Sequence, residues 1–115
     1  MTAKEYLLRS VELKSRIDIK SSEVRRCEDS EAYAELERYK EDLINLEKEL
    51  TSCILKVEDV RYRKILYWLY IEGKKMTPLV KEMQYEYHYL CSLHSKALKE
   101  FERVNKDKLE GLEGE

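Results

Sequence analysis

The chain has 115 residues, of which 40% are charged and 43% are apolar, and its 22 Lys and Arg nearly balance its 24 Asp and Glu. Three Gly and one Pro are too few for the frequent turns of a β-sandwich or barrel. The near-balance of charge argues against a polycationic protein and against an acidic disordered tail. The composition therefore favours an all-helical chain.

Targeting and redox features are few. No apolar run approaches the roughly 18 residues that a membrane-spanning helix needs, and the first ten residues lack the apolar stretch of a signal peptide. We therefore expect no membrane contact and a cytoplasmic location. Cys27, Cys53 and Cys91 are far apart and odd in number, which predicts reduced thiols.

The first half of the chain predicts two antiparallel helices, over residues 3–27 and 30–57. Each stretch repeats apolar residues at spacings of three and four, but the phase shifts by two residues between them. Asp29 or Ser30 can cap the second helix, and Glu31 suits its first turn. The alternative is a single bent helix that dimerises.

The second of these helices carries an unbroken apolar seam with coiled-coil spacing, whereas the first has polar gaps at Ser10 and Lys20. This hairpin seam packs either on the first helix or on a second copy of the chain, so a homodimer stays open. The seam consists of Leu36, Tyr39, Leu43, Leu46, Leu50, Cys53 and Val57. A second apolar stripe, which the C-terminal helices or another subunit must cover, consists of Leu8, Val11, Ile19, Ile44, Ile54 and Leu55.

Residues 58–105 predict a module of three helices. Asp59 is a suitable cap for a helix that ends at Gly73, and Gly73 suits the left-handed position after a helix. A two-turn helix over residues 76–83 and a longer helix from residue 86 to about 105 follow. This order is the layout of a helix-turn-helix.

The core of this module is predicted from apolar spacing. We expect Leu79, Val80 and Met83 of the short helix to pack on Leu66, Leu69 and Tyr70 before it and on Leu90 and Leu93 after it, with Tyr62 and Tyr67 also in the core. The polar tail, residues 106–115, is expected to be flexible. The predicted fold class is thus all-α, with a coiled-coil-like hairpin over residues 1–57 and a helix-turn-helix over residues 58–105.

The residues of this module resemble a known family. Residues 70–73, Leu79, residues 83–85, Leu90 and residues 93–98 look like the C-terminal helix-turn-helix of small phage-encoded regulators, the ArpU-like and RinA-like late-gene transcription activators. Residues 3–7 fit the opening of these proteins. Their module is similar to region four of bacterial sigma factors, which holds a promoter element in the major groove. The resemblance implies an N-terminal helical hairpin and a DNA-binding role in transcription regulation.

The chain departs from the family pattern at the helix ends. Lys75 stands where the family has a capping Thr, so Thr77 is expected to cap one turn later. Gln84 stands at the turn, where a left-handed conformation costs about 1 kcal/mol relative to Gly. Glu86 stands where the family has a capping Ser.

The positive charge is concentrated in the helix-turn-helix. Residues 61–100 hold eight Lys and Arg but four Asp and Glu, whereas residues 1–60 hold 11 and 15. The family's arginine positions correspond to Tyr87, His88, Tyr89, Cys91 and Ser92, so bidentate contact with guanine is not expected from them. The predicted DNA-binding residues are Lys74, Lys75, Lys81, Lys96 and Lys99 for phosphates, and Tyr87, His88 and Ser92 for base edges.

The tyrosines support a rival interpretation, because exposed Tyr and Trp favour protein interfaces. The candidates for a protein contact are Trp68, Tyr85, Tyr87 and Tyr89. The rival is a phage accessory protein whose degenerate helix-turn-helix binds a host protein or nucleoprotein complex, such as a defence enzyme or RNA polymerase.

Neither metal chemistry nor catalysis is expected. His88, Cys91 and His94 recur at a spacing of three, but a zinc site needs a fourth ligand. The family's Leu-His pair implies instead that His94 packs beneath its helix. No nucleophile elbow or phosphate loop occurs, so we expect no enzyme, no cofactor and no small-molecule substrate.

Overall fold

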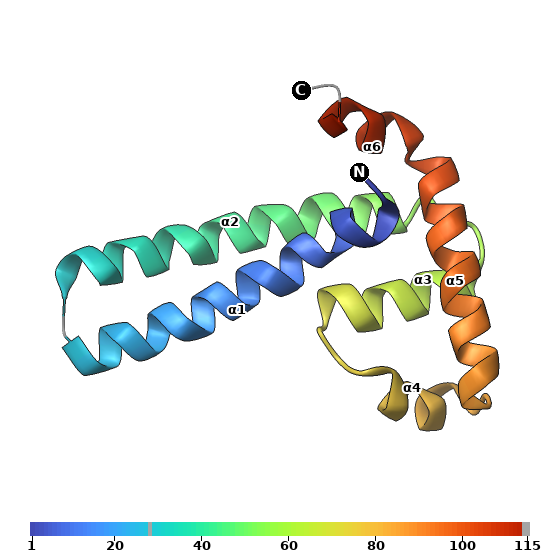
Figure 1. The fold of residues 1–115 in the computed structure, drawn as a ribbon, viewed down its shortest axis with the longest axis horizontal. Helices are drawn as coiled ribbons and strands as arrows, with labels where there is room; N and C mark the ends of the chain where they lie inside the picture. The colour runs from blue at the N-terminus through green and yellow to red at the C-terminus, as the bar shows by residue number, and fades with distance from the viewer. Residues whose placement is uncertain (28, 114–115) are drawn as a thin grey trace.

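The computed structural model describes residues 1–27 and 29–113, and these residues are helical without any strand. The elements are α1 (Ala3–Cys27), α2 (Ser30–Ile54), α3 (Val60–Leu66), η1 (Tyr67–Ile71), α4 (Met76–Met83), α5 (Tyr87–Val104) and α6 (Lys106–Glu113). Figure 1 shows α1 and α2 as a long antiparallel hairpin that projects from the cluster of α3, α4 and α5. The predicted all-α class, with a hairpin before a helical module, is confirmed.

Local signals at the hairpin turn explain why the chain folds back. Asp29 has an extended backbone, and its carboxylate accepts a hydrogen bond from the Glu31 N–H at 2.9 Å. This satisfies an amide that has no partner within the helix. The helix α2 ends at Ile54, before the predicted residue 57, because the chain tightens there and the Val57 N–H bonds the Ile54 carbonyl.

The hairpin seam packs inside the chain. Leu36, Leu50, Cys53 and Val57 are buried, and the other seam residues are half-buried. Cys53 Sγ lies 3.8 Å from the hydroxyl of Tyr6 on α1, so the two helices pack on each other over this part of the seam. The burial favours packing within one chain over the dimer alternative.

The two polar gaps in the first helix have structural partners. The buried Ser10 hydroxyl donates to the Tyr70 carbonyl at 2.5 Å, and the Lys14 ammonium donates to the Ile71 carbonyl. Two of the last carbonyls of η1, which lack helical partners, are thereby satisfied from α1. Lys20 Nζ lies 2.9 Å from both Glu23 and Glu35 and so ties α1 to α2, and hydrogen bonds with these carboxylates raise the pKa of Lys20.

The helix after Asp59 changes its winding. The Asp59 carboxylate accepts from the Arg61 N–H at 2.8 Å, as expected of a cap. From Tyr67 the helix widens to a π-helical turn, in which the Glu72 N–H bonds the Tyr67 carbonyl. This π turn is not predicted by the apolar spacing. Gly73 then has φ of 67°, the left-handed conformation predicted for it.

The chain has two neighbouring cores. The larger joins the hairpin to η1, α5 and α6, and includes Tyr6, Leu50 and Phe101. The smaller lies within the module, and its buried members are Ile65, Leu79, Leu90 and Leu93. The prediction that Leu79 packs with Leu90 and Leu93 is confirmed.

Three residues that were predicted to lie in the module core are located elsewhere. Leu66 and Tyr70 belong to the hairpin core, because their side of the α3–η1 segment faces α1 and α2. Tyr67, predicted to be buried, is exposed. The segment α3–η1 therefore contributes side chains to both cores, so the module and the hairpin do not pack as independent units.

The segment expected to be a flexible tail is helical over residues 106–113, which form α6. Leu109 is buried in the hairpin core, and the Asn105 side-chain amide donates to the Cys53 carbonyl at 3.0 Å. The buried Leu109 side chain and the hydrogen bond from the Asn105 amide hold α6 against α2. Residues 114–115 of the predicted tail lie outside the described residues.

The second apolar stripe of the hairpin is only partly covered. Leu8, Val11 and Ile54 pack into the hairpin core, while Ile19, Ile44 and Leu55 remain exposed. None of the helices in the described residues is long and apolar enough to cross a membrane.

Candidate nucleic-acid interface

The helices α4 and α5 form a helix-turn-helix with a turn of three residues, 84–86. Gln84 adopts the left-handed conformation, with φ of 58° and ψ of 36°, and so redirects the chain after α4. Buried Leu79 on α4 and Leu90 on α5 hold the two helices together in the module core. The geometry leaves the first turns of α5 on the outside, where a recognition helix contacts DNA.

The helix caps differ in part from those predicted. Lys75 precedes α4 without a side-chain hydrogen bond, as predicted. The expectation that Thr77 caps α4 is wrong, since α4 begins at Met76 and Thr77 lies within its first turn. Glu86 does cap α5: its carboxylate accepts from the His88 N–H at 3.2 Å. A longer side chain thus fills the role for which the family uses Ser.

The strained turn yields a prediction about stability. Gln84→Gly is expected to raise the free energy of unfolding by roughly 0.5–1 kcal/mol, because Gly adopts positive φ without steric cost. Urea denaturation of the two proteins measures the difference. Gln84→Ala keeps the strain and serves as the control, and a glycine variant no more stable than the alanine variant would contradict the prediction.

One face of α5 carries an exposed polar stripe, which we call the α5 stripe: Tyr87, His88, Ser92, Ser95, Lys96 and Lys99. From His88 onward these residues recur at spacings of three and four, which places them along one side of the helix, and Tyr87 lies beside them in the first turn. No Asp or Glu occurs between residues 87 and 99. Among the described residues, neither Lys96 nor Lys99 has an ion-pair partner, so both charges are available to an anionic ligand.

The structure extends the predicted set by one residue. Ser95 is exposed between Ser92 and Lys99 and was not among the predicted contacts. Its spacing of three from Ser92 and of seven from His88 is a helical signal that could have identified it.

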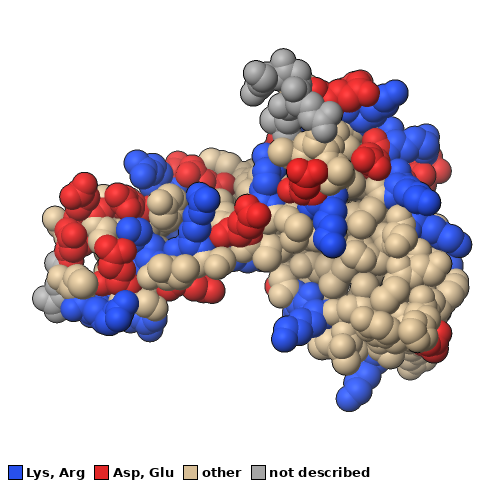
Figure 2. Space-filling model, in the orientation of Figure 1, with Lys and Arg blue, Asp and Glu red and all other residues tan. Residues whose placement is uncertain are grey.

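The remaining predicted phosphate contacts lie outside α5. Lys81 is exposed on α4, and Lys75 is exposed at its start. Lys74 is engaged: its ammonium lies 2.8 Å from the Glu72 carboxylate and 4.4 Å from the centre of the Trp68 ring. All eight predicted DNA-binding residues are exposed, and five of them share the α5 stripe. Figure 2 shows that the surface around α3–α5 is largely uncharged on this face, with Lys and Arg mainly near its edges.

The four candidates for a protein contact divide into two pairs. Trp68 is partly buried against the module core and donates its indole N–H to the Lys75 carbonyl at 2.9 Å. Tyr85 also packs on that core, edge-on to the Tyr89 ring at 5.1 Å. Tyr87 and Tyr89 are exposed, although the Tyr89 hydroxyl accepts a hydrogen bond from Arg61 at 3.2 Å. Arg61 also donates to Asp59, which lowers the pKa of that carboxyl.

The histidines have unlike surroundings. His94 packs beneath α5, as the family resemblance implies, with Nε2 at 2.8 Å from the Tyr70 hydroxyl. Burial lowers the pKa of His94, with a smaller effect of Lys4, and burial raises the pKa of Tyr70 to about 12. His88 is exposed, and its ring lies edge-on to Tyr87 at 5.8 Å. The described residues include no group of three or more His, Cys, Asp and Glu that could hold a metal ion.

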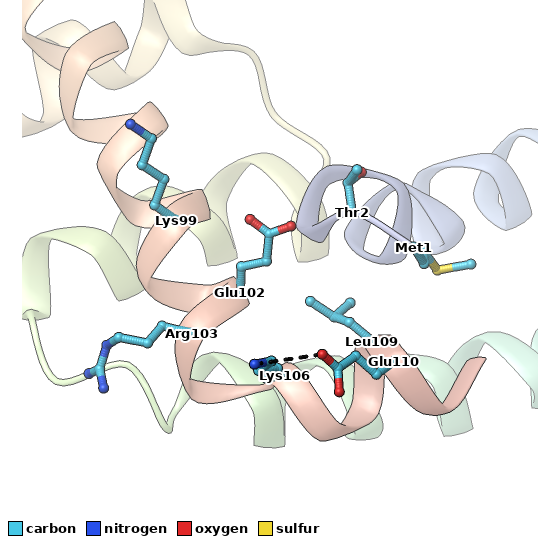
Figure 3. A pocket seen from close by; sticks show the side chains of 8 residues that line it. All are labelled: Met1, Thr2, Lys99, Glu102, Arg103, Lys106, Leu109 and Glu110. Carbon is cyan, nitrogen blue, oxygen red and sulfur yellow. Dashed lines mark ion pairs between the residues drawn. The ribbon is translucent and has the colours of Figure 1, made fainter. Parts of the chain in front are cut away.

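A hollow of about 460 Å³ lies where α5 and α6 meet the start of α1 (Figure 3). Lys99 lines it on one side, and Glu102 extends from α5 toward Thr2. Lys106 pairs with Glu110 at 3.8 Å, and Arg103 pairs with Glu100 outside the hollow. Because its cations are largely matched by carboxylates, this hollow does not prolong the α5 stripe as a surface for anions.

Comparison with protein families, with curated proteins and with solved structures finds no match to this chain.

Proposed function

We propose that this chain is a phage-type transcription regulator that binds double-stranded DNA through α5, in the cytoplasm of the host. The observation that carries the proposal is the α5 stripe: an exposed helical face after a three-residue turn, with two unpaired lysines and no carboxylate over residues 87–99. A recognition helix requires an outward face of this kind.

In the proposed complex the first turns of α5 enter the major groove. Tyr87, His88 and Ser92 contact base edges or phosphates there, while Lys96 and Lys99 contact phosphates further along the helix. Lys75 and Lys81 contact the backbone from α4. Without an Arg on the stripe, no bidentate contact with guanine forms, so base discrimination is modest and phosphate contacts supply most of the affinity.

A salt titration tests this proposal. Binding of a fluorescently labelled random duplex is measured by anisotropy between about 50 and 200 mM salt. Three to five phosphate contacts predict that log K falls against log salt with a slope of about −3 to −4.5. Polyglutamate at the same total charge is expected to compete poorly with the duplex. Failure to bind the duplex at about 50 mM salt would refute the proposal.

The second candidate function is binding of a host protein or nucleoprotein complex. It is favoured by the exposure of Tyr87 and Tyr89 at positions where the family carries arginine. A combined Lys81→Glu and Lys96→Glu variant distinguishes the two functions, because it should abolish DNA binding and leave a contact centred on tyrosine largely intact. A host partner captured after nuclease treatment, and lost on Tyr87→Ala, would favour this second candidate.

A further inference from the structure

A long trough runs along the outer face of α2, beside α3 and η1. Two adjoining hollows of about 580 and 330 Å³ form it, and both are lined by Thr51, Leu55 and Tyr67. Ile44 lines one end and Val60 the other. We call this feature the α2 trough; none of its lining residues belongs to the α5 stripe.

The floor of the α2 trough is apolar and exposed. The exposed fractions are 55% for Ile44, 63% for Leu55, 68% for Val60 and 40% for Tyr67. These four make up half of the eight large apolar residues that are exposed in the described part of the chain. Single exposed apolar residues are ordinary, but a contiguous group inside a groove is typical of a binding surface.

The shape of the trough suits a helix. Its α2 wall runs from Ile44 to Leu55, which at 1.5 Å per residue is roughly 16 Å, or about three turns, and the trough continues past Leu55 to Val60. Two helical segments side by side leave a groove into which the side-chain ridges of a third helix fit. A peptide that binds by strand addition would need a strand edge to pair with, and the described residues contain no strand.

The charges around the trough are mostly positive. Lys48 lies at the Ile44 end, and Arg63 and Lys64 lie at the Val60 end. Within the described residues, Lys48 and Arg63 have no ion-pair partner, and Lys64 reaches Glu82 only at 3.9 Å. The one acidic lining residue, Glu47, is already 3.6 Å from Lys14. A partner with carboxylates on both flanks of an apolar face would therefore be complementary to the trough.

A second copy of the chain fits less well. In a two-fold symmetric contact the same surface patch of both copies meets itself, so these basic ends would approach each other. Like charges brought together at an interface weaken association. The charge pattern thus favours a different, acidic partner.

We propose that the α2 trough binds an acidic amphipathic helix of about three turns, contributed by a protein partner. Leu55 and Tyr67 contact the apolar face of that helix at its centre, with Ile44 and Val60 at its ends. Lys48 and Arg63 pair with its flanking carboxylates. Because the trough and the α5 stripe share no residue, the chain can hold this helix and DNA at the same time.

Two synthetic peptides test the proposal. Each has 18 residues, a fluorescent label and Leu at helical spacings of three and four; one carries Glu on both flanks of the Leu face, and the other carries Lys. Anisotropy titration against the full chain is expected to show saturable binding of the Glu peptide, at least tenfold tighter than binding of the Lys peptide. Leu55→Ser is expected to weaken binding of the Glu peptide at least tenfold, and Lys48→Glu combined with Arg63→Glu is expected to reverse the preference.

Ile19→Ser is the matched control, because Ile19 is equally exposed but lies on α1 and does not line the trough. It should leave binding of the Glu peptide unchanged, and circular dichroism should show that all variants remain helical. Equal affinity for both peptides, or no effect of Leu55→Ser, would overturn the proposal. So would a dimer, seen by light scattering, that Leu55→Ser dissociates, since a second copy would then occupy the trough. Failure of the DNA titration alone would leave this proposal standing.

Discussion

The Phe101→Ala variant is expected to unfold with a free energy about 3–5 kcal/mol below that of the wild-type chain. Phe101 lies on α5 but is fully buried in the hairpin core, with its ring centre 6.0 Å from that of Tyr6 on α1. Truncation removes the largest apolar side chain that joins α5 to the hairpin and leaves a cavity between them. A loss of this size is a large part of the 5–15 kcal/mol that stabilises an ordinary domain.

Urea denaturation measured in two ways checks this result. Trp68 is the only tryptophan and lies in the module, so its fluorescence reports the module, whereas circular dichroism reports all the helices. Since one core joins hairpin and module, both signals should change in a single transition, and both midpoints should fall in the variant. Tyr87→Ala, an exposed aromatic truncation on the same helix, should cost less than about 0.5 kcal/mol. A Trp68 transition unaffected by Phe101→Ala would contradict the shared core.

The parts of the fold that local signals specify were predictable. Asp29 and Asp59 are small acceptors at helix starts, and Gly73 tolerates positive φ, so each marks a boundary without reference to the rest of the chain. The phase shift between the two apolar seams is also a local signal, and it predicted the break between α1 and α2. Exposure of the six candidate DNA contacts on α4 and α5 agrees with helical periodicity, whereas Lys74 and Lys75 lie in the loop before α4.

The parts that depend on tertiary contact were not predictable. The tail, residues 106–115, is expected to be flexible because it is polar and contains two glycines, yet residues 106–113 form α6 and Leu109 is buried in the hairpin core. Ser10 interrupts the apolar seam of α1, but its hydroxyl donates to the Tyr70 carbonyl near the end of the π turn. Tyr67 is exposed although its neighbours Leu66 and Tyr70 are buried. Such outcomes depend on which distant element packs against a residue, and spacing along one helix does not contain that information.

The combined Lys96→Glu and Lys99→Glu variant is expected to bind random duplex DNA about 100-fold more weakly than the wild-type chain at about 100 mM salt. Each phosphate contact contributes about 0.9 to the slope of log K against log salt, which at 0.1 M corresponds to roughly eightfold in affinity. Loss of two contacts therefore accounts for roughly 60-fold, and repulsion between the new carboxylates and phosphates adds to it. The slope itself should become shallower by about 2.

Control variants can distinguish an effect of the position of these charges from an effect of the net charge. Arg38→Glu combined with Lys40→Glu changes the net charge equally, but both residues are exposed in the first half of α2, within the part of the hairpin that projects away from α5 (Figure 1). This control should lose less than about threefold, because charges far from the bound DNA are largely screened by salt. Lys96→Arg combined with Lys99→Arg keeps both charges and should retain the wild-type slope. If the two glutamate variants lost affinity equally, binding would depend on the overall charge of the protein and not on the position of the lysines. That result would contradict the α5 stripe as the DNA interface.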